Sequence, residues 1–240
     1  MMKQFSIIFL SMTMLIHCSP KDWEAIQETA KEVLEEGPAP LSNQEVISGL
    51  KEALTIGIKN AAGQASKLDG FNKNQLIHIP WPEEANKMKS RLVEFGLKNQ
   101  VDQFELTLNR AAEEASKEAI PVFVEAIKGM SIQDGFKILN DGNGAATTFL
   151  KQKTTAELTA KFAPITKNAI NKVELTKYWN PLATKYNTIP FVEKVNPDLD
   201  QYVTERAIAG LFKLVELEEN KIRQDPKARV TELLKRVFGS

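Results

Sequence analysis

The chain of 240 residues has few side chains suited to nucleophilic or metal chemistry. Its one cysteine is Cys18, and its two histidines are His17 and His78. A structural zinc site needs about four Cys or His ligands, and both thiol redox chemistry and an internal disulfide need two cysteines. The sequence therefore predicts no metal site and no cofactor. His78 has no acid or nucleophile beside it in the sequence, so we expect it to pack rather than to act as a base.

The loop 141–144, Asp-Gly-Asn-Gly, is a candidate for binding a polar ligand. Asp141 and Asn143 alternate as at the start of a calcium loop, but the twelfth position is Gln152 in place of Glu. The glycines and Thr147 could instead present backbone amides at a helix start to an anion. The loop lacks the lysine of a phosphate loop, and a plain turn between helices is the alternative.

Three further residues are candidates for binding. Asn109 borders an apolar helical stripe, and a buried Asn must find hydrogen-bond partners, so it is expected to join two helices or to contact a ligand. Trp81 and Trp179 lie near prolines in breaks between helices, where an aromatic side chain either caps the core or lines the mouth of a site.

Other charged residues fit either an exposed surface or a catalytic cleft. The spacing of Arg110 with Glu114, and of Glu219 with Arg223, predicts exposed ion pairs one helical turn apart. A catalytic alternative requires several polar side chains to converge in one cleft, and the candidates are Asp69, Asp134, Asn109 and Arg206.

The overall charge argues against a nucleic-acid partner. Lys and Arg together number 31, as do Asp and Glu, so the formal net charge is zero. A protein that binds nucleic acid needs a clustered positive field to replace the counterions of the phosphates. The 42% of hydrophobic residues suffices instead for a substantial core.

The N-terminus predicts an export signal that ends at Cys18. Lys3 precedes residues 5–16, which are 12 uncharged residues. A signal-peptide core has about 7 to 15 residues, whereas a bilayer-spanning helix needs about 20. Leu15-Ile16-His17-Cys18 resembles the lipobox of bacterial lipoproteins, with His17 at a position that usually carries Gly, Ala or Ser. We therefore expect residues 1–17 to be a signal peptide with a lipobox.

Cys18 is then the predicted site of lipid attachment, and acyl chains on it would hold the protein on a membrane. We expect a periplasm-facing protein anchored to a bacterial membrane. Ser19, in place of Asp, favours the outer membrane. The alternatives are a secreted protein cleaved without lipidation and an uncleaved cytoplasmic chain.

The rest of the chain is predicted to be helical. Residues 18–40 contain a short amphipathic helix and a Pro-rich linker, and residues 41–240 form the main domain. The first expected helix of this domain starts at Ser42, where Glu45 completes a capping box. Further helices are expected over 83–95, over 101–123 with a kink or a restart at Pro121, over 131–139 and in a short piece at 149–150. The last ones are expected over 154–170 behind a second box of Thr154 and Glu157, in a segment capped by Asp198 or Asp200, and after Pro226. We expect an all-α, bundle-like single domain of about eight or more helices, with at most one short extended or strand segment near residues 75–80.

Nine segments of this domain carry a family resemblance. They are GLKEAL (49–54), DGF (69–71), HIPWP (78–82), NRAAEEA (109–115), GAATTFL (144–150), KFAPI (161–165), YVTERAIAGLF (202–212), EENKIRQDP (218–226) and LLKRVFG (233–239). Together they resemble the recurring segments of an uncharacterised bacterial family, domain of unknown function 4197. The resemblance covers about residues 41–239 and implies an exported helical protein. It implies no activity and no catalytic residues.

The sequence thus predicts an envelope lipoprotein with a binding or structural role. Helical proteins readily open apolar sites between helices, so we expect either a hydrophobic small molecule or a protein partner, besides the membrane itself. The alternative is an enzyme with a polar cleft.

Overall fold

The computed structural model describes residues 41–172, 179, 183–184, 187–188, 190–191, 194–195 and 198–239, without the side chains of Glu84 and Arg91. The expected signal peptide, Cys18 and linker lie outside these residues. A compact unit begins at Leu41. Among the described helices, none is both long enough and apolar enough to cross a membrane.

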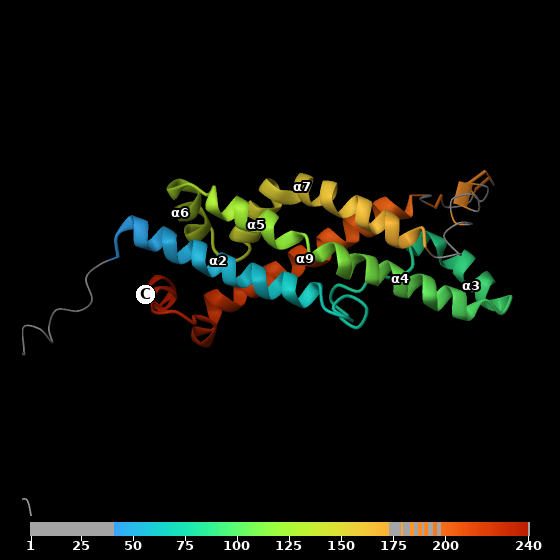
Figure 1. Cartoon of the computed structure of the whole chain (residues 1–240), viewed down its shortest axis with the longest axis horizontal. Helices are drawn as coiled ribbons and strands as arrows, with labels where there is room; N and C mark the ends of the chain where they lie inside the picture. The colour runs from blue at the N-terminus through green and yellow to red at the C-terminus, as the bar shows by residue number, and fades with distance from the viewer. Residues whose placement is uncertain are drawn as a thin grey trace, which may run out of the picture. The chain divides into compact units, whose positions relative to one another are not determined.

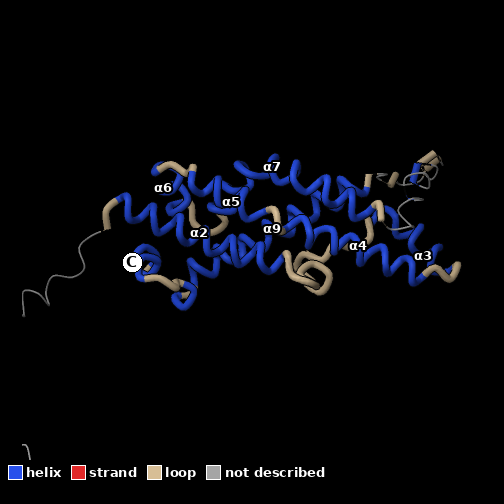
Figure 2. Tube along the Cα trace, in the orientation of Figure 1, coloured by secondary structure: helices blue, strands red, loops and turns tan. Residues whose placement is uncertain are grey.

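The described residues form helices and loops and no strand, as Figures 1 and 2 show. The α-helices are α2 (Asn43–Ala65), α3 (Asn86–Glu94), α4 (Lys98–Ser116), α5 (Ala119–Lys128), α6 (Ile132–Asn140), α7 (Ala145–Ile170), α9 (Leu199–Gln224) and α10 (Glu232–Phe238), with 3-10 turns η1 (Glu83–Ala85) and η2 (Pro226–Ala228). The all-α fold class is confirmed.

The expected number of helices was slightly too high. In the described part, seven α-helices have nine residues or more, and α10 has only seven. One reason is that residues 145–170 form the single helix α7. The Thr154 hydroxyl donates to the carbonyl of Leu150 at 2.6 Å within that helix, so it does not begin a new helix.

Other boundaries follow the local sequence signals. Ser42 and Glu45 form the expected capping box at the start of α2, with the Ser42 N–H 2.8 Å from the Glu45 carboxylate. The Asp198 side chain caps α9. Of the kink or restart expected at Pro121, the structure shows a restart: α4 ends at Ser116, and Pro121 lies in the first turn of α5, where a missing N–H leaves no hydrogen bond broken.

Helices α2, α4, α5, α7 and α9 enclose the core. Helix α7 packs against α9, α4 and α5, and α2 packs against α9 and α5 (Figure 1). Most of the buried apolar side chains form one continuous cluster. The loop after α2 joins this core because Phe71 is fully buried against Gly210 of α9. A Cβ at position 210 would lie 2.8 Å from the Phe71 ring, so the contact requires glycine.

Candidate functional site

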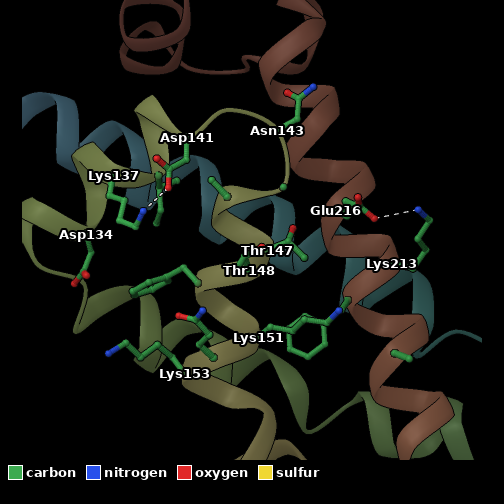
Figure 3. Close-up of a pocket in the computed structure, with 17 residues that line it drawn as sticks. Asp134, Lys137, Asp141, Asn143, Thr147, Thr148, Lys151, Lys153, Lys213 and Glu216 are labelled. Carbon is green, nitrogen blue, oxygen red and sulfur yellow. Dashed lines mark hydrogen bonds and ion pairs between the residues drawn. The ribbon is translucent and has the colours of Figure 1, made fainter.

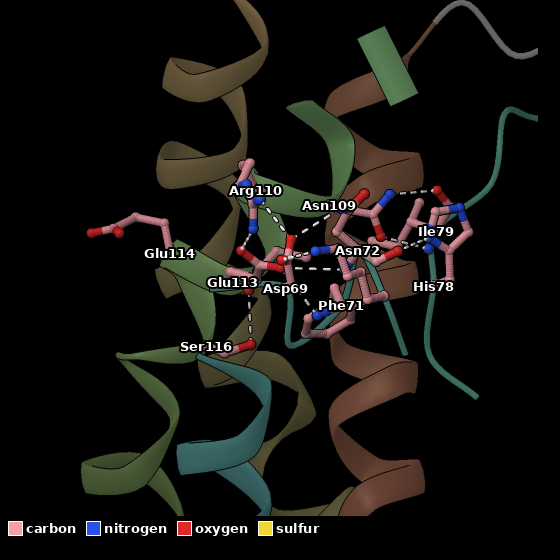
Figure 4. Close-up of polar contacts among 12 residues, drawn as sticks. Asp69, Phe71, Asn72, His78, Ile79, Asn109, Arg110, Glu113, Glu114 and Ser116 are labelled. Atoms are coloured by element: carbon pink, nitrogen blue, oxygen red, sulfur yellow. Dashed lines mark hydrogen bonds and ion pairs between the residues drawn. The ribbon is translucent and has the colours of Figure 1, made fainter. Parts of the chain in front are cut away.

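Asn109 attaches the segment before α3 to helix α4 (Figure 4). Its Oδ1 accepts from the Ile79 N–H at 2.8 Å, and its Nδ2 donates to the carbonyls of Ile79 and Glu105, each at 2.9 Å. The side chain is 0% exposed. The segment expected near 75–80 is therefore not a strand: Gln75–Ile77 is a turn, and the Ile79 backbone pairs with a side chain. Asn109 has no N–H left for a ligand.

His78 does have an acid beside it, which the sequence did not indicate. Its Nε2 lies 3.0 Å from Oε1 of Glu105 on α4, and its Nδ1 lies 3.0 Å from the Asn72 carbonyl. Lys89 Nζ lies 2.7 Å from the other Glu105 oxygen. Burial raises the pKa of the Glu105 carboxyl, but hydrogen bonds from Lys89 and His78 outweigh it and leave that pKa lowered. Around the His78 ring lie an orienting acid, a lysine that binds this acid, and a backbone carbonyl, but no nucleophile. This arrangement favours a packing role for His78.

Glu113 is the first of two buried carboxylates that hold distant backbone. It is 5% exposed and accepts from the N–H groups of Phe71 and Asn72 at 3.1 and 3.2 Å. Arg110 Nη1 donates to it at 2.6 Å. The expected pair of Arg110 with Glu114 is thus wrong, since Arg110 turns toward the core-facing carboxylate and Glu114 pairs with Lys117.

Glu219 is the second buried carboxylate. It is 6% exposed and accepts from the N–H groups of Ala146 and Thr147 at 3.1 and 2.9 Å, and from the Thr147 hydroxyl at 2.8 Å. Arg223 donates to it and also to the carbonyl of Ile138 at 2.8 Å. The expected pair of Glu219 with Arg223 exists, but it is buried instead of exposed because the carboxylate caps the start of α7.

We call Glu113 with Arg110, and Glu219 with Arg223, the carboxylate staples. In each, a helical Glu takes two consecutive N–H groups of a segment far away in the sequence and pairs with an Arg of its own helix. The two staples join four of the nine segments that carry the family resemblance: DGF with NRAAEEA, and GAATTFL with EENKIRQDP.

The loop 141–144 is a turn that leads into a helix whose start is already capped. Gly142 and Gly144 have φ of 78° and 79°, the left-handed region that glycine tolerates best. Asp141 pairs with Lys137 at 2.6 Å. The amides expected to receive an anion are taken by Glu219, and Thr147 binds the same carboxylate. Within the part that the structure describes, no three His, Cys, Asp or Glu side chains come together as metal ligands.

Trp81 and Trp179 lie in the core. Both are buried, and they pack with Phe104 at ring-centroid distances of 4.4 Å for Trp81 to Phe104, 5.8 Å for Trp179 to Phe104 and 5.7 Å between the two tryptophans. The Trp81 indole N–H donates to the Ala85 carbonyl at 3.1 Å. Of the two expected roles, the structure supports capping the core.

The four candidates for a catalytic cleft are not brought together. Asp69 binds Arg110 at 2.7 Å, and hydrogen bonds from Lys73, Asn72 and Arg110 hold the pKa of its carboxyl well below the usual range. Asp134 caps α6 through Ser131, and the guanidinium of Arg206 lies over the Tyr202 ring. Asn109 binds the Ile79 backbone. Across the described ranges, no hydrogen bond or ion pair joins any two of Asp69, Asp134, Asn109 and Arg206.

A depression of about 680 Å³ lies between α6, α7 and α9, and Figure 3 shows the side chains around it. Its charged lining consists of Lys137, Lys151, Lys153, Lys213, Asp134, Asp141 and Glu216. Phe149 and Phe212 add two aromatic faces. Asn143 and Thr147, both candidates from the sequence, also line it, together with Asp141. The sequence did not indicate that four lysines from three helices would share one concave surface.

An apolar pocket beneath α10 is too small for a ligand. It lies between α2, α9 and α10, where Leu50, Leu54, Ile222 and Phe238 meet, and its volume is about 10 Å³. A cavity needs about 10 to 15 Å³ to hold one water molecule. Between α2, α9 and α10, core side chains therefore fill the space where an apolar ligand site was expected.

The geometry defines a class: an all-helical domain held by two carboxylate staples, with an open, lysine-lined depression. In a comparison with protein families, residues 40–239 match the family described as "Protein of unknown function (DUF4197)". The chain belongs to this family. Searches among curated proteins and among solved structures each found no match.

Proposed function

We propose that the chain is a lipoprotein of the bacterial envelope, anchored through an acylated Cys18, whose bundle-like helical domain binds a polar small molecule in the depression between α6, α7 and α9. The lipobox-like Leu15–Cys18 supports the anchor, and Ser19 favours the outer membrane. The depression supports the binding role.

The size and lining of the depression are the observation that carries this proposal. About 680 Å³ falls within the roughly 300 to 1,000 Å³ of small-molecule sites. Polar and charged side chains from three helices line the depression together with two phenylalanines, which is a mixture that orients a ligand while burying part of it. The ligand class therefore differs from the hydrophobic molecule expected from the sequence.

Binding accounts for the geometry better than catalysis does. Outside the depression, the carboxylates of Glu105, Glu113 and Glu219 each accept hydrogen bonds that hold the fold. Inside the depression, Asp134, Asp141 and Glu216 each have a partner on the same helix or beside its start. Two of these carboxylates do accept from a hydroxyl, Asp134 from Ser131 at 2.7 Å and Glu219 from Thr147 at 2.8 Å. In both cases the carboxylate also accepts backbone N–H groups at the start of a helix, so the hydroxyl belongs to a helix cap.

The test is native mass spectrometry of the mature protein purified from a bacterium that processes lipoproteins. We expect a co-purifying small molecule, and we expect Ala209→Trp to displace it, because Ala209 is exposed on α9 and lines the depression. Leu217→Trp is the matched control, since Leu217 is 40% exposed on the same helix outside the depression. A small molecule retained equally by both variants would show that it binds elsewhere.

A further inference from the structure

We infer that the ligand of the depression carries phosphate, and that Lys151 and Lys153 of α7 supply the charge that recognises it. This inference rests on the proposed function, because it names the chemical class bound by the same site. The evidence is the distribution of charge partners around the depression (Figure 3).

The three carboxylates of the lining are already engaged. Asp134 accepts from the Ser131 hydroxyl at 2.7 Å, and hydrogen bonds from Ser131 lower the pKa of the Asp134 carboxyl. Asp141 pairs with Lys137 at 2.6 Å, and Glu216 pairs with Lys213 at 3.0 Å. The acidic side chains thus satisfy local partners and neutralise two of the four lysines.

Lys151 and Lys153 have no ion-pair partner among the described residues. Their ammonium groups lie over aromatic rings instead, each 5.8 Å from a ring centroid, Lys151 over Phe212 and Lys153 over Phe149. Lys153 is near enough to Asp134 to contribute to lowering its pKa, but the two form no ion pair. A contact with an aromatic face stabilises an exposed ammonium group only weakly, so an anion competes readily for both groups.

The number of cations indicates a multiply charged anion such as phosphate rather than a single carboxylate. Lysine binds phosphate as a point charge, and several lysines around one depression suit an anion that carries more than one negative charge. The described lining of the depression holds four lysines and no arginine. Lys137 and Lys213 belong to exposed ion pairs, which contribute little to stability, so a multiply charged anion can recruit these lysines too.

The start of α7 does not supply this site. Glu219 already occupies the N–H groups of Ala146 and Thr147, and the Thr148 N–H donates to the Gly144 carbonyl at 2.9 Å. The anion must therefore bind further along α7, where the lysines lie. Gln152, also in the lining and on α7, is a neutral donor available to orient it.

The test measures binding of two phosphate probes to the chain from residue 18 onward with Cys18→Ala, so that no acyl chain inserts into lipid. Isothermal titration with inorganic pyrophosphate tests a soluble ligand. Co-sedimentation with phosphatidylglycerol vesicles, against phosphatidylcholine vesicles, tests a lipid headgroup. The variant is Lys151→Gln with Lys153→Gln, and the matched control is Lys161→Gln with Lys167→Gln, which removes the same charge from α7 outside the depression.

We expect at least one probe to bind, and we expect the depression variant to weaken that binding by about tenfold or more while the control changes it less than about twofold. Binding of pyrophosphate identifies a soluble source, and binding of the anionic vesicles alone identifies a headgroup. If both double variants weaken binding equally, the effect is due to net charge and the inference is overturned. It is also overturned if the wild-type chain binds neither pyrophosphate nor the anionic vesicles. If neither probe binds while mass spectrometry finds an uncharged co-purifying molecule that Ala209→Trp displaces, the binding role stands and only the phosphate assignment fails.

Discussion

Removing the Glu219 carboxylate should destabilise the domain strongly. Glu219→Ala leaves the N–H groups of Ala146 and Thr147 and the Thr147 hydroxyl without their acceptor. It also leaves the half-buried Arg223 with the Ile138 carbonyl as its remaining partner in this cluster. Breaking a buried, hydrogen-bonded ion pair costs about 3–5 kcal/mol. For a domain of this size, that corresponds to a fall in Tm of about 6 to 20 °C.

The assay is urea unfolding followed by far-UV circular dichroism, with Glu216→Ala as the control. Glu216 lies on the same helix, but its side chain is 40% exposed and its pair with Lys213 is a surface one, so the control should cost less than about 1 kcal/mol. Glu219→Gln keeps the shape and one acceptor and should fall between the two. If Glu219→Ala and Glu216→Ala lower the unfolding free energy equally, the reasoning that the staple holds α7 is refuted.

Three other predictions concern α4 and its neighbours. Asn109→Leu should cost about 2–4 kcal/mol in urea unfolding, since both backbone groups of Ile79 lose their buried partner. His78→Gln should cost less than about 1 kcal/mol because the pair with Glu105 is partly exposed, and a larger loss would give His78 a role in the core. Because the pKa of Glu105 is lowered by folding, its contribution to stability is present above its unfolded pKa of about 4.3 and is lost as the pH falls through the folded value. Below about pH 4, wild-type Tm should therefore fall more steeply than that of Glu105→Gln; parallel curves would contradict this.

Local signals predicted the helical fold well. The capping box of Ser42, the Asp198 cap and the restart at Pro121 each depend on residues within one turn of the boundary. Thr154 misled for the same reason: its spacing to Glu157 fits a capping box, yet both lie inside α7. Whether a hydroxyl caps a helix or bonds the preceding turn depends on the packing of the whole helix, which the spacing does not contain.

The site was less predictable because it depends on contacts between distant residues. Glu113 and Phe71 are 42 positions apart, and Glu219 and Ala146 are 73 apart. A Glu and an Arg one helical turn apart indicate an exposed ion pair. A staple differs only in the distant backbone N–H groups that the Glu accepts, and the sequence does not show which segment supplies them. The depression was missed likewise, since its lysines come from α6, α7 and α9.

The most direct test of a lipid-anchored binding protein is the mass of its N-terminal peptide. The full-length chain is expressed in a bacterium that processes lipoproteins and purified from the membrane fraction, with Cys18→Ala as the control. The proposal predicts a wild-type peptide that begins at Cys18 and carries the mass of a diacylglycerol, and a control that lacks this mass and leaves the membrane fraction. A wild-type chain with a free Cys18 thiol in the soluble fraction would contradict it.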